Sequence, residues 1–166
     1  MPESADLARA YRRNLAGEQV AIHLPFEGAT AGLTAAQAAL APGPRFNSVW
    51  AIANHLWFWE ESLLRLLTGQ PASHEAIGAP DGSGWGMAGD PADDAAWAAH
   101  RARALETGLR LADHIDGLDT AALDADLPAW GGTVRRGCYG ILAHNSYHTA
   151  EILTVRHMQG WWVENT

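Results

Sequence analysis

The sequence is poor in cysteine, in basic residues and in long apolar runs, and each shortage argues against a class of protein. Cys138 is the only cysteine among 166 residues, so neither a disulfide framework nor a cysteine-based zinc ribbon can form within the chain. The 11 basic residues are outnumbered by 19 acidic ones, for a net charge of −8, which argues against a nucleic-acid-binding protein. No apolar run approaches the roughly 20 residues of a membrane-spanning helix.

The rest of the composition is that of an ordinary globular protein. Hydrophobic residues make up 48% of the chain and charged residues 18%, a balance typical of a folded domain. A chain of this length can bury one core of its own, so we expect a single domain over residues 1–166. The first ten residues, MPESADLARA, lack the apolar core and the cleavage site of a secretory signal peptide. We therefore expect a cytoplasmic protein.

Apolar residues recur at helical spacing in four segments of the chain. Steps of three and four positions place them on one face of a helix. The segments cover residues 3–16, 48–67, 90–115 and 133–162. Proline and glycine interrupt residues 17–46, where we expect only broken helical pieces, such as one over 33–40. No strand pattern competes strongly, so the sequence predicts an all-α four-helix bundle with an interrupted N-terminal helical region.

Residues with capping and breaking tendencies mark the expected helix ends. Asn47 is a candidate N-cap and Gly69 a candidate stop for the second helix, while Asp90 followed by Pro91 is a typical start for the third. Residues 70–92 then form a long loop between helices two and three, rich in Gly, Pro, Ser and Asp. A loop of this length is often either a functional lid or disordered. We expect Trp85, in its middle, to anchor it on the bundle.

Histidine is the residue type that points to chemistry. Of eight histidines, only His144 and His148 have the i, i+4 spacing that places two rings on one helix face. Chance gives about 0.4 such pairs in a chain of this composition, so the spacing alone is weak evidence. These two lie on or beside the apolar face of their helix, and His55 lies beside that of the second helix. Buried histidines need hydrogen-bond partners or a metal, and both explanations remain open at this point.

Three segments resemble parts of a known family. TVRRGCYGILAHNSYHTAEILTVRHMQGWW (residues 133–162) resembles the last helix of the DinB-like superfamily, also called the DinB/YfiT-like metalloenzymes. That helix carries two histidines separated by three residues, the second often after Tyr and before a small residue and Gln-Ile. Here it reads His144-Asn-Ser-Tyr-His148-Thr-Ala-Glu-Ile. NSVWAIANHLWFWEESLLRLLTGQ (residues 47–70) resembles the second helix, which supplies a third histidine, here His55. GLTAAQAALAPGPRFNSVW (residues 32–50) resembles the region before it.

The resemblance, which is not to the polymerase of similar name, implies a DinB/YfiT-like four-helix bundle. In such a bundle His55, His144 and His148 would bind one divalent metal ion near one end. Zinc and nickel both suit imidazole ligands, and three histidines with an open fourth position are a recurring catalytic zinc arrangement. The resemblance also implies a homodimer. The aromatic pair Trp161-Trp162 could contribute to it, unless these side chains fold back on their own bundle.

The resemblance also limits the functions to be considered. Members of the family include transferases that use low-molecular-weight thiols such as bacillithiol or mycothiol, and a maleylpyruvate isomerase. It thus implies a metal-dependent transferase with a small thiol as cosubstrate, or a hydrolase, acting on small molecules. The alternative is a non-catalytic, metal-stabilised binding protein related to stress.

Residues near the histidines are candidates for supporting roles. Glu151, where the family more often has Gln, lies one turn beyond His148. It is the candidate catalytic residue, acting as a base. Alternatively, it could hydrogen-bond to a metal-binding histidine, or it could be a carboxylate that only faces solvent. Asn145 and Tyr147 are candidate hydrogen-bond donors behind the ligands, although Tyr147 lies off the histidine face. We interpret Cys138 as a small core residue.

Overall fold

The computed structural model describes residues 2–17, 24–78 and 84–163. Its four long helices are α1 (Glu3–Leu15), α4 (Val49–Leu67), α6 (Asp94–Asp116) and α8 (Val134–Met158). The shorter elements are helices α2 (Phe26–Ala29), α3 (Ala35–Ala39), α5 (His74–Ile77) and α7 (Thr120–Asp124), strands β1 (Asp126–Leu127) and β2 (Gly132–Thr133), and the 3-10 helix η1 (Pro128–Trp130). The all-α prediction is confirmed.

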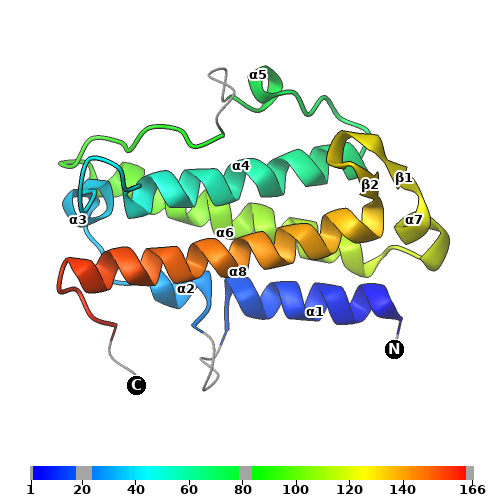
Figure 1. Ribbon diagram of the computed structural model, residues 1–166, viewed down its shortest axis with the longest axis horizontal. Helices are drawn as coiled ribbons and strands as arrows, with labels where there is room; N and C mark the ends of the chain where they lie inside the picture. Colours follow the sequence, from blue (N-terminus) through cyan, green and yellow to red (C-terminus); the bar gives the residue numbers. More distant parts are fainter. Residues whose placement is uncertain (1, 18–23, 79–83, 164–166) are drawn as a thin grey trace.

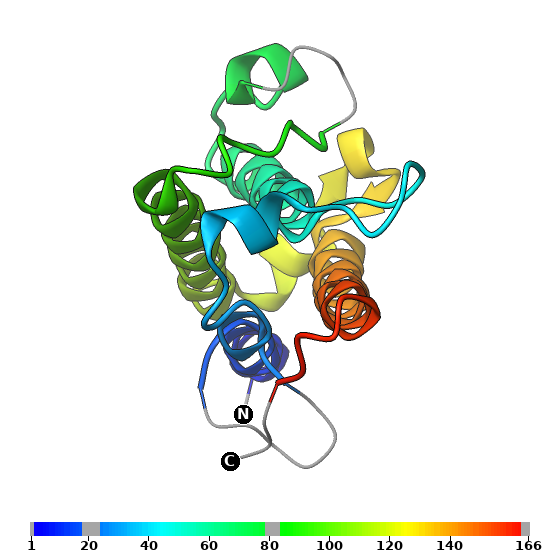
Figure 2. The ribbon, with the colours of Figure 1, turned by 90° about the vertical axis from the view of Figure 1, so that its left-hand side faces the viewer.

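The four long helices form a bundle (Figure 1). Viewed along the bundle, they occupy four corners (Figure 2), and contacts link α4 to α6, α6 to α1, α1 to α8 and α8 to α4. The short helix α2 continues the line of α1, while α3 covers one end of the bundle against α4 and α6. The interrupted N-terminal region therefore forms one corner of the bundle from two separate helices, α1 and α2. No helix in the described part of the chain is both long and apolar enough to cross a membrane.

The starts of two long helices differ from the prediction. Ser48, rather than Asn47, caps α4, because its side chain accepts a hydrogen bond from the backbone N–H of Ala51. α6 begins at Asp94 and is capped by Asp93, so Pro91 is not in its first turn. Residues 90–93 form a turn instead, in which the Asp90 carbonyl accepts from the Asp93 N–H. Both corrections arise because several neighbouring Asp, Asn and Ser residues compete for the cap.

The last helix is shorter than predicted, and a small sheet precedes it. α8 ends at Met158 because Gly160 adopts a left-handed conformation with φ of 77°, so Trp161 and Trp162 lie beyond the helix. Strands β1 and β2 pair antiparallel and enclose η1. Two-residue strands are too short to produce an alternating pattern, which explains why the sequence did not predict them.

The apolar core is divided into two clusters. The first joins α1 and α7 to the C-terminal halves of α4 and α6 and the N-terminal half of α8; the second joins α2 and α3 to the opposite halves of the same three helices. Along each of these three helices, buried polar residues lie at a level between the clusters: Glu60 of α4, Thr107 of α6, and Asn145, His148 and Thr149 of α8. Two more buried polar residues of α4, Asn54 and His55, lie at the edge of the second cluster.

A buried carboxyl group organises part of this polar level. The Tyr11 hydroxyl donates to Glu60 Oε1 at 3.1 Å, and Asn145 Nδ2 donates to the same oxygen at 2.6 Å. Gly108 makes room for the group, because a Cβ there would lie 2.7 Å from Glu60 Oε1. Burial raises the pKa of Glu60 from its usual 4.5 to about 8, despite the two hydrogen bonds. Glu60 is therefore mostly uncharged at neutral pH.

Replacing Glu60 with Gln should change how stability depends on pH. Between pH 4.5 and 8 the unfolded carboxyl has lost its proton while the folded one retains it, so the wild type loses stability as pH rises. The difference in unfolding free energy, wild type minus Glu60→Gln, should fall by up to about 1 kcal/mol per pH unit across that window. Denaturant unfolding of both proteins in chelator at several pH values measures it. A difference independent of pH would show that Glu60 ionises normally.

Candidate metal centre

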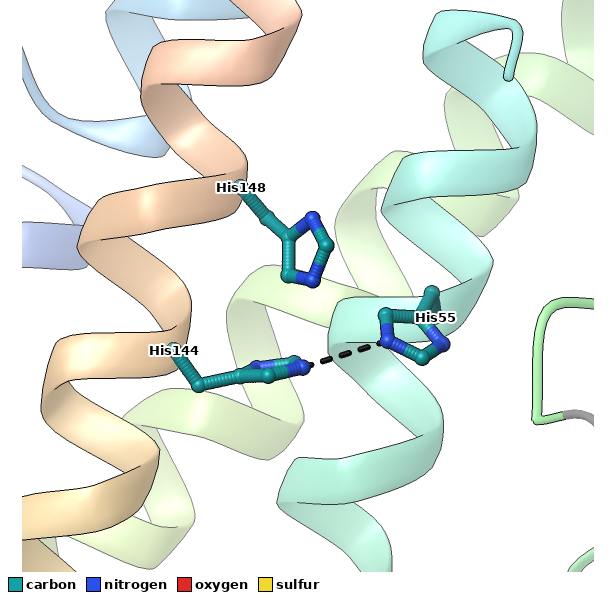
Figure 3. Close-up of side chains that lie close together, drawn as sticks. All are labelled: His55, His144 and His148. Carbon is teal, nitrogen blue, oxygen red and sulfur yellow. Dashed lines mark hydrogen bonds between the residues drawn. The ribbon is translucent and has the colours of Figure 1, made fainter. Parts of the chain in front are cut away.

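Three histidines from two helices meet at the polar level of the bundle. His55 comes from α4, and His144 and His148 come from α8; the three rings point toward one another (Figure 3). One ring nitrogen of each lies within 4.8 Å of those of the other two, so the group can hold a metal ion. His55 and His148 are only 6% and 5% exposed. The cluster lies midway along α8, not near one end of the bundle as the resemblance implied.

The hydrogen bonds at Nδ1 fix the tautomer of each ring. His55 Nδ1 donates to the carbonyl of Gly84 at 3.1 Å, and His148 Nδ1 donates to Glu151 Oε2 at 2.7 Å. His144 Nδ1 donates to Asn145 Oδ1 at 3.3 Å, because the amide nitrogen of Asn145 is already committed to Glu60 and Tyr11. Carbonyl and carboxylate oxygens only accept, so all three Nδ1 atoms carry the hydrogen.

The three Nε2 atoms therefore present lone pairs to one small space. His55 Nε2 and His144 Nε2 lie 3.2 Å apart, where two lone pairs repel unless a cation lies between them. Ligands of a tetrahedral zinc ion are about 3.3 Å apart, so this pair has a suitable spacing. Burial, together with the neighbouring rings, lowers the pKa of His55 to about 4 and also lowers that of His144. Neutral imidazole is the form that binds a metal.

The loop between α4 and α6 reaches the centre at Gly84 and Trp85. The indole of Trp85 stacks on His55, with ring centroids 3.8 Å apart and planes 7° apart, and it meets the edge of His148 at 5.4 Å. Gly84 has φ of +67°, and a Cβ there would lie 2.8 Å from the ring of Phe58. Only glycine therefore fits where the backbone offers its carbonyl to His55. Trp85 packs on the bundle as expected, directly over a proposed ligand; residues 79–83 of the loop lie outside the described residues.

Glu151, the candidate catalytic residue, lies behind His148 on the side opposite Nε2. Its Oε2 accepts from His148 Nδ1, and its Oε1 accepts from Asn47 Nδ2 at 3.5 Å. This geometry fits a residue that orients a candidate metal ligand, here His148, through a hydrogen bond. Asn145 has the same place behind His144, whereas Tyr147 is exposed and only meets the His148 ring edge-on.

The remaining candidates lie away from the centre. Cys138 is buried among core residues, and burial raises the pKa of its thiol to about 11. His100 accepts a hydrogen bond from the indole N–H of Trp50 and is half-buried. His157 is exposed and stacks on Trp162. His23 lies outside the described residues.

Sequence reasoning missed two contributors to the centre. Glu60 falls on the apolar face of α4, four residues after Leu56 and three before Leu63. A carboxyl residue at such a position signals burial, so periodicity could have found it. The backbone carbonyl of Gly84 has no comparable signal, because its role depends on how the loop folds over α4.

Comparison with known families gives a match to the DinB superfamily: its family model matches residues 26–152, a range that contains all three histidines. No curated protein and no solved structure matches the chain.

Removing the carboxylate behind His148 should weaken metal binding. Glu151→Ala leaves the His148 Nδ1–H without its acceptor, so the ring loses its fixed orientation, and affinity for zinc should fall about 10- to 100-fold. Glu151→Gln, whose amide oxygen can still accept, should retain most of the affinity. Competition with a chromophoric chelator measures both, with the exposed Glu106→Ala as control. Equal affinities for the wild type and Glu151→Ala would rule out this role.

Proposed function

The chain belongs to the DinB superfamily, and on that basis we propose that it is a metal-dependent transferase that joins a small thiol to an electrophilic small molecule. The observation that carries the proposal is the convergence of three imidazole lone pairs in a largely buried space. Among the described residues no other His, Cys, Asp or Glu joins the group. Three protein ligands leave a position for a ligand from outside the chain, as in catalytic zinc sites.

The chemistry follows from the donor set. A divalent ion held by three neutral imidazoles keeps its full charge, so it lowers the pKa of a thiol or water beside it and makes a nucleophile available at neutral pH. Zinc and nickel are the metals we propose, since imidazole suits both. In the transfer, the thiol sulfur forms a bond to carbon of the acceptor. The thiol proton passes to solvent, and the leaving group departs with its electron pair.

The residues of the chain hold and shield this site. The Gly84 carbonyl, Asn145 and Glu151 keep the three Nε2 atoms available, so Glu151 acts as a positioning residue through His148. Trp85 covers the His55 ring and keeps water from that side. The chain cannot supply the attacking thiol itself, because Cys138 is buried in the core with a raised pKa. A separate thiol is therefore needed, and water in its place would give hydrolysis.

Catalysis should require the metal, the thiol and His55 together. We expect zinc- or nickel-loaded protein to conjugate a small thiol to an aryl halide acceptor. His55→Ala should lower turnover at least about 100-fold, because losing a metal ligand costs more than losing a residue that hydrogen-bonds to a ligand. His157→Ala, an exposed histidine outside the centre, is the matched control. Turnover should be followed with and without thiol, and metal content measured for each protein.

The outcomes separate the possible functions. Turnover that persists after verified metal removal would contradict the metal mechanism. Turnover of an ester that needs no thiol would favour a hydrolase. Stoichiometric metal binding without turnover for any thiol would favour the non-catalytic binding protein.

We also propose that the chain forms a homodimer. Superfamily membership supports this, and so does Trp162, which is 68% exposed beyond the end of α8. Trp161 instead packs against the second core cluster. Trp162→Ala should shift the dimer toward monomer because an exposed indole contributes apolar area to an interface. Light scattering at micromolar concentration tests this, and a wild type that is monomeric there would contradict the dimer.

A further inference from the structure

A second feature of the bundle adjoins the histidine cluster at His144. A cavity of about 250 Å³ is lined by Trp59, Trp130, Gly140, Ile141 and His144. His144 belongs both to this cavity and to the histidine cluster. The ring of Trp59 lies 6.5 Å from that of His144 and 6.1 Å from that of His55. A molecule in the cavity would therefore lie directly beside the metal ligands.

The wall formed by Trp130 is built by the small sheet. Strands β1 and β2 pair Asp126 with Thr133 and Leu127 with Gly132. This pairing holds the segment between them, residues 128–131 including η1, as a short loop that we call the lip. Gly131, with φ of +69°, makes the return turn. Leu127 is buried in the first core cluster and anchors the lip. Trp130 meets Trp59 edge to face, with centroids 5.9 Å apart.

The lining of this cavity selects for apolar groups. Apart from the His144 ring and the indole N–H groups, it offers no hydrogen-bonding side chain, and it has no charged side chain. Aromatic walls bind flat rings by stacking and edge contacts. A closed apolar cavity of about 150 Å³ holds benzene. A cavity of about 250 Å³ thus has room for one aromatic ring with a short substituent.

We infer that this cavity binds an aromatic ring of the acceptor substrate, so that the reacting carbon lies next to His144. The inference rests on the proposed transferase function and names its substrate class: a small molecule with an aryl group attached to or bearing the electrophilic carbon. Sugars, phosphates and other strongly hydrated acceptors are excluded, because the cavity cannot replace the hydrogen bonds that they make with water.

Gly140 provides a direct test. It is exposed on α8 and lines the cavity, and a Cβ at this position would meet no atom within 4 Å. Gly140→Leu therefore fills the cavity without a clash, and leucine favours a helix more than glycine does. Ala143→Leu, at an exposed position on the same helix outside the cavity lining, is the matched control.

The probe is 4-fluorobenzyl alcohol, and its dissociation constant is measured by fluorine NMR on the zinc-loaded chain. Gly140→Leu should weaken binding at least about tenfold, since it removes the apolar space for one ring. Ala143→Leu should stay within about twofold of the wild type. Equal affinity for the wild type and Gly140→Leu overturns the inference. A weaker affinity for the probe at higher protein concentration also overturns the inference, because it would mean that a second copy of the chain covers the cavity.

A further variant separates this inference from the proposed function. The walls of the cavity do not include His55, so metal-free His55→Ala should still bind the probe within about threefold of the wild type. If the wild type binds the probe but no metal, the transferase proposal fails and the cavity remains a ring-binding site. If it binds metal but not the probe, the transferase proposal stands and the ring-binding inference is overturned.

Discussion

A polar group buried inside a helix bundle needs a partner, and the middle of this bundle contains more polar groups than the chain can pair. Asn145 joins Tyr11, Glu60 and His144 into one network. The three Nδ1 atoms of the histidine cluster are each matched to an oxygen, while the three Nε2 atoms are left facing one another. The fold therefore satisfies one nitrogen of every ring and leaves the other for a cation. This unequal pairing makes the centre suited to a metal.

The two sides of the centre are different, and the difference gives a direction of approach. Trp85 stacks on His55 and covers that side with a segment of the α4–α6 loop. His144 borders a cavity that Trp85 does not line, and its aromatic walls leave space for a ring. Under the proposed function, the substrate would therefore approach beside α8 and η1, where this cavity lies. Trp59 lies between the two regions, since its ring meets both the His55 ring and the Trp130 ring edge to face.

The parts of this arrangement that could be predicted from the sequence are those that depend on helical periodicity. The spacing of His144 and His148, and the position of His55 beside an apolar face, indicate buried histidines, whereas the ligand set of three came from the resemblance to the DinB family. Glu60 carries the same kind of signal, since a carboxyl group on an apolar face indicates burial. The Gly84 carbonyl, the stacking of Trp85 on His55 and the lip that carries Trp130 arise from contacts between segments distant in sequence. Sequence periodicity reports only local structure, so it does not predict such contacts.

The broken corner of the bundle has a consequence for the order of assembly. α2 has only four residues, too few to form a stable helix alone. The carbonyls of Ala29 and Ala31, at its end, are bound by the guanidinium of Arg156, which belongs to α8. An early segment is thus held in place by the last long helix, the same helix that provides His144 and His148. During synthesis on the ribosome, neither the N-terminal corner nor the histidine cluster can be completed until α8 has emerged.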